Sequence, residues 1–145
     1  MALDQSFIER NRASTDRIRA LAARLTDAEM QQPVGKHWTV AIALAHLAFW
    51  DRRVMYVLDS TERDGTLFIP EIDIFVNDLS LPLWAAIPPR EAARIAIETS
   101  EELDRRLEDY PPALLAEIYA YNQRWVVREM HRGEHLDEVD AALNG

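Results

Sequence analysis

Apolar side chains recur every three or four residues along most of the chain, which is the period of helices that pack on one face. The pattern predicts a first helix over residues 4–25, where Phe7 and Leu21 share one stripe. Asn11 and Ser14 fall on the same stripe. Polar residues there indicate either a polar pocket inside the protein or partial exposure near the helix end. We favour exposure, because polar residues lie mostly at protein surfaces.

The most apolar stretch of the sequence predicts a second helix over residues 40–59. Thr39 is suited to cap its first turn, and Trp38 immediately precedes that cap. Upstream of both, Thr26 and Glu29 have the spacing of a capping box, which predicts a short helical turn. Because the second helix is apolar on nearly every side, we expect it to be buried against more than one neighbour.

Polar and proline-rich segments separate the remaining helices. Residues 60–65 are polar and begin a long connection, which contains a short predicted helix over residues 72–79 and is punctuated by prolines as far as Pro89. A third helix is predicted over residues 90–108 and a fourth over residues 121–142.

Four long helices, with one long connection between the second and the third, predict an all-α fold: a four-helix bundle with a crossover. A chain of 145 residues, 48% of them hydrophobic, is the size of a single domain spanning residues 1–145. The absence of cysteine excludes disulfides, thiolate nucleophiles and cysteine-based zinc sites.

The charge balance restricts the partners of the protein. Lys and Arg number 16 against 25 Asp and Glu, which gives a net charge of −9. This acidic balance argues against binding to nucleic acid or to an anionic membrane surface. No apolar run approaches the roughly 18 residues of a membrane span, and the N-terminal residues lack the apolar core of a signal peptide. We therefore expect a cytoplasmic protein with neither nucleic-acid nor membrane partners.

Two of the four histidines have the spacing of a metal-binding helix. His131 and His135 are four residues apart, which stacks both rings on one helix face. Their nitrogens can then reach a common ion at about 2.0–2.1 Å. The pair alone is a weak signal, because neighbours such as Arg132 and Glu134 are also typical of a solvated face.

His46 adds weight to the metal hypothesis, because it lies in the middle of the most apolar predicted helix. A buried imidazole without a partner costs about 1–3 kcal/mol, so His46 needs a hydrogen bond, a carboxylate or a metal. If the second and fourth helices face each other, His46, His131 and His135 form a three-histidine site. Three protein ligands leave a position open for water or substrate, which is typical of catalytic metal sites. The alternative is a hydrogen-bonded core histidine and a solvated pair.

Two further residues near these histidines need an interpretation. Gly133 lowers helix propensity by about 1 kcal/mol relative to alanine, which is compatible with the close approach of another helix or of a ligand. His37 precedes the predicted second helix at a loop junction, so we expect it at the surface and assign it no role.

Several short motifs follow one another in a characteristic order. After the first amphipathic helix come Leu25-Thr-Asp-Ala-Glu29, Trp38-Thr-Val, Leu44-Ala-His46-Leu47, Ile72-Asp-Ile-Phe-Val-Asn77 and His131-x-x-x-His135. In this order and at this length, the chain resembles the DinB/YfiT-like superfamily of metalloenzymes, which includes the N-terminal domain of the mycothiol-dependent maleylpyruvate isomerase. The resemblance extends from about residue 7 to residue 143.

The resemblance implies a four-helix bundle in which His46, His131 and His135 hold a divalent metal ion, commonly nickel, zinc or iron. Relatives include transferases and isomerases that use mycothiol, bacillithiol or glutathione, so a small-molecule substrate and a low-molecular-weight thiol are implied partners. The sequence ends at Gly145, so we expect the second domain of maleylpyruvate isomerases to be absent, which argues against that isomerisation. No thiol-binding motif is evident.

Two hypotheses of function follow. In the first, the protein is a metal-dependent enzyme that activates water or a thiol, as a hydrolase or a thiol transferase would. Its catalytic residues are not identified; Asn11, Asn77 and Glu138 are candidate helpers, and for Glu138 we favour a plain surface position. In the second, the protein is a non-catalytic helical bundle that acts as a ligand-binding or oligomerisation module.

Two apolar groups bear on the second hypothesis. The aromatic residues around the predicted second helix, among them Trp38, Trp50 and Tyr56, are expected in the core rather than in a pocket. Residues 68–84 are too apolar for a solvated loop. They are expected either to cover the bundle or to pack in a homodimer, because apolar patches of this kind often mark interfaces.

Overall fold

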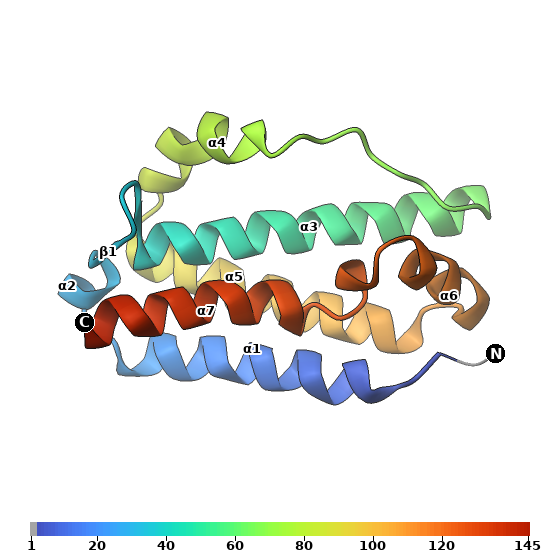
Figure 1. The fold of residues 1–145 in the computed structure, drawn as a ribbon, viewed down its shortest axis with the longest axis horizontal. Coiled ribbons are helices and arrows are strands. Elements are labelled where there is room, and N and C mark those ends of the chain that lie inside the picture. Colours follow the sequence, from blue (N-terminus) through green and yellow to red (C-terminus); the bar gives the residue numbers. More distant parts are fainter. Residues whose placement is uncertain (1–2) are drawn as a thin grey trace.

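A computed structural model of the chain describes residues 3–145 and is almost entirely helical (Figure 1). In chain order the elements are α1 (Ser6–Arg24), α2 (Asp27–Met30), β1 (Pro33–Val34), β2 (Trp38–Thr39), α3 (Val40–Asp64), α4 (Phe75–Ala85), α5 (Pro89–Asp109), α6 (Pro112–Tyr121), the 3-10 helix η1 (Gln123–Trp125) and α7 (Glu129–Asn144). The all-α prediction is confirmed.

The long helices α1, α3, α5 and α7 lie side by side along the long axis of the molecule (Figure 1). Helix α3 contacts α5 and α7, and α1 contacts the same two helices from the other side. Helix α4 lies against the outer side of α3, and an extended segment after α3 leads to it (Figure 1). This arrangement places α3 opposite α7, which is the relationship that the histidine hypothesis requires.

The start of α3 is fixed by a cap and by a small hairpin. The Thr39 side chain accepts a hydrogen bond from the Ile42 amide at 3.2 Å, as predicted for the cap. Strands β1 and β2 pair Val34 with Trp38 in antiparallel register, and Gly35 makes the turn at φ 67°. The hairpin holds the Trp38 indole beside the first turns of α3. The capping box between Thr26 and Glu29 is also present.

Helix α3 is longer than the predicted second helix. It continues past residue 59 to Asp64 and ends at Gly65, whose φ of 73° is left-handed and whose amide bonds the Thr61 carbonyl. The residues of this last part of the helix are polar, but two of them are buried: Ser60 and Thr61 are 1% and 0% exposed.

The predicted fourth helix, residues 121–142, is wrong at its start. Residues 112–121 form a separate helix, α6, which begins at Pro112. Proline suits this first position, because the first backbone N–H groups of a helix have no acceptor within the helix and the N–H that proline lacks is not needed. Asn122 then takes an extended conformation with φ −154°, and its side chain accepts from the Arg124 amide to open η1. Helix α7 begins only at Glu129.

Helix α4 also differs from its prediction. The short helix expected over residues 72–79 begins later, at Phe75, and runs through Pro82 to Ala85. Trp84 packs on α3, whereas Phe75, Leu79 and Leu83 are 68%, 75% and 71% exposed. Most of the apolar surface of α4 therefore faces away from the described part of the chain.

Two large apolar clusters occupy opposite ends of the core, and a buried polar layer lies between them. Along α1 the order is Phe7 in one cluster, then Asn11, then Ile18 in the other. Along α3 the same order appears in reverse, with Asp51 between Leu47 and Val54. The layer crosses the molecule next to the histidines. Within residues 3–145, no helix is both long and apolar enough to cross a membrane.

Candidate metal centre

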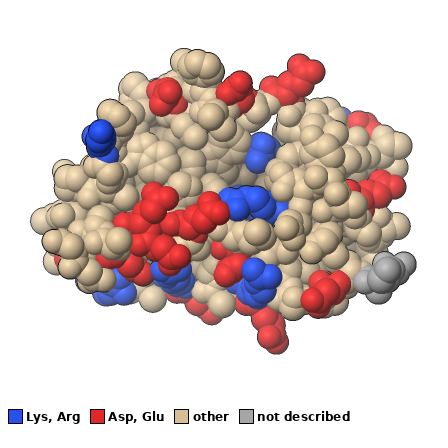
Figure 2. All heavy atoms as spheres, in the orientation of Figure 1, with Lys and Arg blue, Asp and Glu red and all other residues tan. Residues whose placement is uncertain are grey.

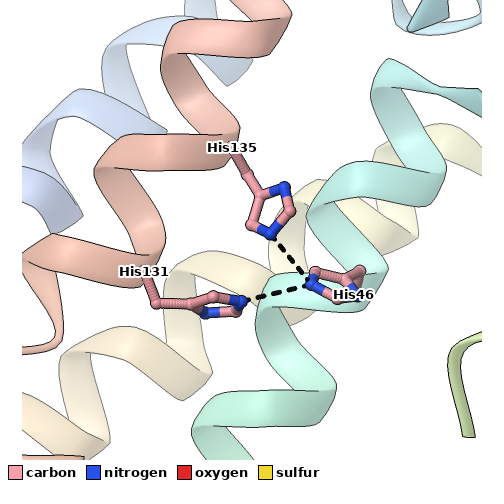
Figure 3. Close-up of side chains that lie close together, drawn as sticks. All are labelled: His46, His131 and His135. Carbon is pink, nitrogen blue, oxygen red and sulfur yellow. Dashed lines mark hydrogen bonds between the residues drawn. The ribbon is translucent and has the colours of Figure 1, made fainter. Parts of the chain in front are cut away.

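Helices α3 and α7 bring the three predicted histidines to one point (Figure 3). His46 projects from α3 and is 3% exposed, while His131 and His135 project from successive turns of α7. The Nε2 atom of His46 lies 3.2 Å from Nε2 of His131 and 3.1 Å from Nε2 of His135. Rings that are 85 and 89 positions apart in the sequence thus share one centre.

The spacing of these nitrogens matches a shared metal ion. For nitrogens bound at about 2.05 Å, a separation near 3.1 Å corresponds to an angle at the metal of about 100°, which lies between octahedral and tetrahedral values. The three ligand atoms all lie within 4.8 Å of one another. All three donors are imidazole nitrogens, which suit zinc, nickel, copper and iron. The group could therefore hold a divalent ion.

Burial keeps the three imidazoles neutral, which is the form that binds metal. Desolvation lowers the pKa of His46 to about 3, and the neighbouring His135 adds to the effect. Desolvation and the charge of Arg128 depress the pKa of His131 as well. Desolvation also lowers the pKa of His135, although Glu138 and Glu134 work in the opposite direction. At neutral pH, none of the three rings therefore has to lose a second proton before it can bind a metal.

Aromatic rings enclose the centre on the α3 side. The Trp38 ring lies 4.5 Å from the His46 ring and 5.5 Å from the His135 ring. The rings of Trp84 and Trp50 lie 5.6 Å and 6.2 Å from that of His46. The expectation that these aromatics belong to the core is confirmed for Trp50, which is 7% exposed, and is wrong for Tyr56, which is 58% exposed. Trp38 is partly buried and packs against two core clusters.

Arg128, which precedes α7, contacts the outer nitrogen of His131. Its Nη2 atom lies 3.2 Å from Nδ1 of His131. A guanidinium can only donate, so Nδ1 of His131 accepts this hydrogen bond. The same guanidinium donates through Nε to Asp51 on α3 at 2.9 Å, and Arg128 is 2% exposed. Arg128 thereby links one of the three histidines to the buried polar layer.

Arg132 lies at the middle of that polar layer and is completely buried. It forms ion pairs of 3.0 Å with Asp51 and 2.9 Å with Asp104, and it donates to the hydroxyls of Ser14 and Thr15. These contacts tie α7 to α1, α3 and α5 at the turn between His131 and His135. A buried charge is tolerated when it is paired and hydrogen-bonded in this way.

Asn11 and Ser14 belong to the same layer, so the expectation of partial exposure for them is wrong. They are 1% and 4% exposed. The amide of Asn11 donates to the Val126 carbonyl at 2.8 Å, and its oxygen accepts from the Glu129 amide at 3.0 Å. One contact is to the segment that leads into α7 and the other is to its first residue, so Asn11 fixes where the histidine helix begins.

The remaining candidates have peripheral places. Asn77 accepts from the Trp50 indole at 2.9 Å and also acts to raise the pKa of His46. Glu138 has an exposed carboxylate 3.7 Å from the outer nitrogen of His135, in keeping with a surface position. His37 is exposed, as expected. No atom of another helix lies within 4 Å of a Cβ built at Gly133, so the inference of a close approach by a second helix there is wrong, and the approach of a ligand stays a prediction.

Sequence reasoning missed the roles of Arg128 and Arg132. Charged neighbours on both sides made Arg132 resemble a residue on a solvated face. The available signal lay elsewhere, in isolated polar residues at core positions. Asp51 interrupts the apolar run of α3, and Asp104 sits beside the core residue Leu103. Buried carboxylates at such positions require a buried cation.

Comparison with known proteins gives one match. The family model for the mycothiol maleylpyruvate isomerase N-terminal domain matches residues 11–130. The matched range includes His46 and stops one residue before His131. No curated protein and no solved structure matches the chain.

Proposed function

The chain belongs to the mycothiol maleylpyruvate isomerase N-terminal domain family, within the DinB/YfiT-like superfamily, and on this premise we propose that it is a metal-dependent enzyme. In this proposal, His46, His131 and His135 hold a divalent ion such as nickel, zinc or iron. The reaction activates water or a low-molecular-weight thiol, as in a hydrolase or a thiol transferase. The packing of α1, α3, α5 and α7 supports a four-helix bundle with a crossover as the scaffold.

One observation carries the proposal: the Nε2 atoms of His131 and His135 on one helix lie within hydrogen-bonding distance of the Nε2 atom of His46 on another. Each imidazole is held neutral by burial, so mutual repulsion of charged rings does not oppose the convergence. A structural core would gain nothing from directing three ring nitrogens at one another.

A bound divalent ion supplies a Lewis acid, which lowers the pKa of a coordinated water or thiol. The chain itself supplies the setting. Three neutral ligands leave the full charge of the ion uncompensated and leave a position open. The Trp38 and Trp84 rings exclude water from the α3 side, and Arg132 fixes the turn of α7 that carries His131 and His135.

The metal content of protein purified without an affinity tag tests the proposal. We expect about one divalent metal per chain, with His46→Ala and His131→Ala each abolishing it. His37→Ala is the matched control, because it removes an exposed histidine outside the centre. Protein that stays empty after titration with nickel, zinc and iron would exclude the proposal.

Water and thiol activation can be separated with cobalt-substituted protein. Cobalt supplies a visible spectrum that changes when the ligand at the open position changes. A spectral change on addition of glutathione or another thiol would support a thiol transferase. A spectrum that does not change with thiols but does change with pH, as a coordinated water loses its proton, would support a hydrolase.

The alternative of a non-catalytic oligomerisation module is favoured by the exposed apolar side chains of α4. Phe75, Leu79 and Leu83 lie on one helix, and each is more than two-thirds exposed. The predicted homodimer would bury this face. Sedimentation of the wild type and of Leu79→Glu tests it: the charge should dissociate a dimer that uses α4. If metal binds but no substrate perturbs the centre, the alternative gains.

A further inference from the structure

A small cavity of about 70 Å³ lies beside the centre, between α3, η1 and the start of α7. His131 forms part of its wall, and so do the side chains of Trp50, Arg53, Trp125 and Arg128. The cavity has room for roughly two water molecules, which is also the size of one carboxylate group. A larger ligand could place only one polar end in it.

Two buried N–H donors in the wall of this cavity have no acceptor. They are Nε of Arg53 and Nε1 of Trp125, and neither finds a hydrogen-bond partner within residues 3–145. Such atoms are rare in folded proteins, because an unpaired buried donor costs about 1–3 kcal/mol. The two side chains are adjacent, since the Arg53 guanidinium carbon lies 5.0 Å from the centre of the Trp125 ring.

Of the three arginines in the cavity wall, only Arg53 lacks an anionic partner among the described residues. Arg124 is paired with Glu134 at 2.7 Å, and Arg128 is paired with Asp51 at 2.9 Å. Across the described residues, no carboxylate forms an ion pair with Arg53, whose guanidinium is held between the Trp50 and Trp125 rings instead. Burial and the charge of Arg128 lower the pKa of Arg53 to about 10. The surroundings thus destabilise the charged form of Arg53, and no carboxylate of the described residues compensates for this effect.

From these observations we infer that the cavity is an anion subsite, in which Arg53 and the Trp125 indole bind the carboxylate of a small organic acid. A carboxylate supplies the acceptors that both N–H groups lack and the negative charge that Arg53 lacks. Its location beside His131 puts the rest of the acid within reach of the histidine centre. The inference deepens the proposed function, because it assigns the substrate or cosubstrate a carboxylate.

Benzoate and benzamide form the test pair, because they share a ring and differ in charge. Metal is first removed with a chelator, so the outcome does not depend on the histidine centre. Two-dimensional NMR then follows the indole N–H signals of the four tryptophans during titration. We expect benzoate to shift the Trp125 and Trp50 signals saturably and benzamide to leave them unchanged at the same concentrations.

Variants locate the anion. Arg53→Met keeps the length and the aromatic stacking of the side chain but removes the charge, so it should weaken benzoate binding about tenfold or more. Arg53→Lys should retain part of the affinity. Arg52→Met is the matched control, because Arg52 is adjacent to Arg53 in the sequence but does not line the cavity, so binding should stay at the wild-type value.

Three results would overturn the inference: equal shifts with benzoate and benzamide, no shift with either, or wild-type affinity in folded Arg53→Met. The last outcome would leave the cavity as a water site. If Arg53→Met does not fold, Arg53→Lys and the ligand pair still decide the matter. The metal content of the same samples before chelation tests the proposed function by itself, so a failure of the anion subsite and a failure of the metal centre can be told apart.

Discussion

The guanidinium of Arg128 lies 3.2 Å from Nδ1 of His131, so a permanent donor faces the ring nitrogen that points away from the centre. Histidines that bind metals usually donate from that nitrogen to an oxygen atom. Here the nitrogen must accept, so the neutral ring of His131 carries its proton on Nε2. A metal bound at Nε2 therefore requires this proton to move or leave.

The first prediction concerns that proton. In metal-free protein, nitrogen NMR should show Nδ1 of His131 unprotonated and Nε2 protonated. Addition of zinc should make Nε2 the bare, metal-bound nitrogen and should break the contact with Arg128. If Nδ1 already carries the proton before zinc is added, the hydrogen bond from Arg128 does not exist in solution.

The second prediction is a loss of stability on acidification. The folded pKa of His46 is about 3, below the ordinary 6.5, so between these pH values the unfolded chain binds a proton that the folded chain does not. Stability contributed by the neutral ring is therefore complete above pH 6.5 and is lost as pH falls toward 3. Each such histidine adds a slope of about 1.4 kcal/mol per pH unit.

Denaturant titrations of metal-free protein between pH 7 and pH 4 measure this slope. His46→Gln should reduce it, because glutamine does not titrate, whereas His37→Gln should leave it unchanged. An equal slope in wild type and His46→Gln would mean that other groups cause the acid sensitivity. Saturating zinc at one hundred times its Kd should add about 2.7 kcal/mol at pH 7.

The third prediction concerns Arg132. Arg132→Met should destabilise the protein by about 3–5 kcal/mol, because Asp51 and Asp104 would remain buried without their shared cation. Chemical denaturation at pH 7 measures the loss. Arg12→Met is the control, since its ion pair with Glu108 is at the surface and should contribute little. A small effect of Arg132→Met would show that water reaches the polar layer.

The fourth prediction is a gain of stability at Gly133. No atom would obstruct a Cβ there, and the residue is helical, so Gly133→Ala should stabilise by about 0.4–1 kcal/mol. Gly65→Ala is the opposite case, because its φ of 73° disfavours a side chain and should cost about 1–2 kcal/mol. Thermal melts of both variants measure the difference. Destabilisation by Gly133→Ala would indicate that α7 needs flexibility between its histidines.

Local patterns were enough to predict much of this molecule. Helices α1 and α5 follow the apolar periodicity, and the cap at Thr39 and the spacing of His131 and His135 are readable from a few neighbouring letters. His46 was informative because a polar ring in an apolar helix needs a partner. Each of these inferences depends on residues within a turn or two of one another.

Features that depend on distant residues were not predictable in the same way. The start of α7 is set by Asn11 on α1, which bonds the backbone on both sides of Arg128. Arg132 is buried because Asp51 and Asp104 meet it from two other helices. No local pattern distinguishes such an arginine from an exposed one, since the distinction arises only when four helices assemble.

The distance along the chain between His46 and His131, 85 positions, gives the centre one more property. An unfolded chain can present His131 and His135 together but must close a long loop to recruit His46, at an entropic cost that grows with the logarithm of loop length. A metal held by all three rings would consequently act as a reversible crosslink between the two halves of the polypeptide. The apparent affinity for the metal would therefore depend on the fraction of molecules in which the two halves are assembled as in the native fold.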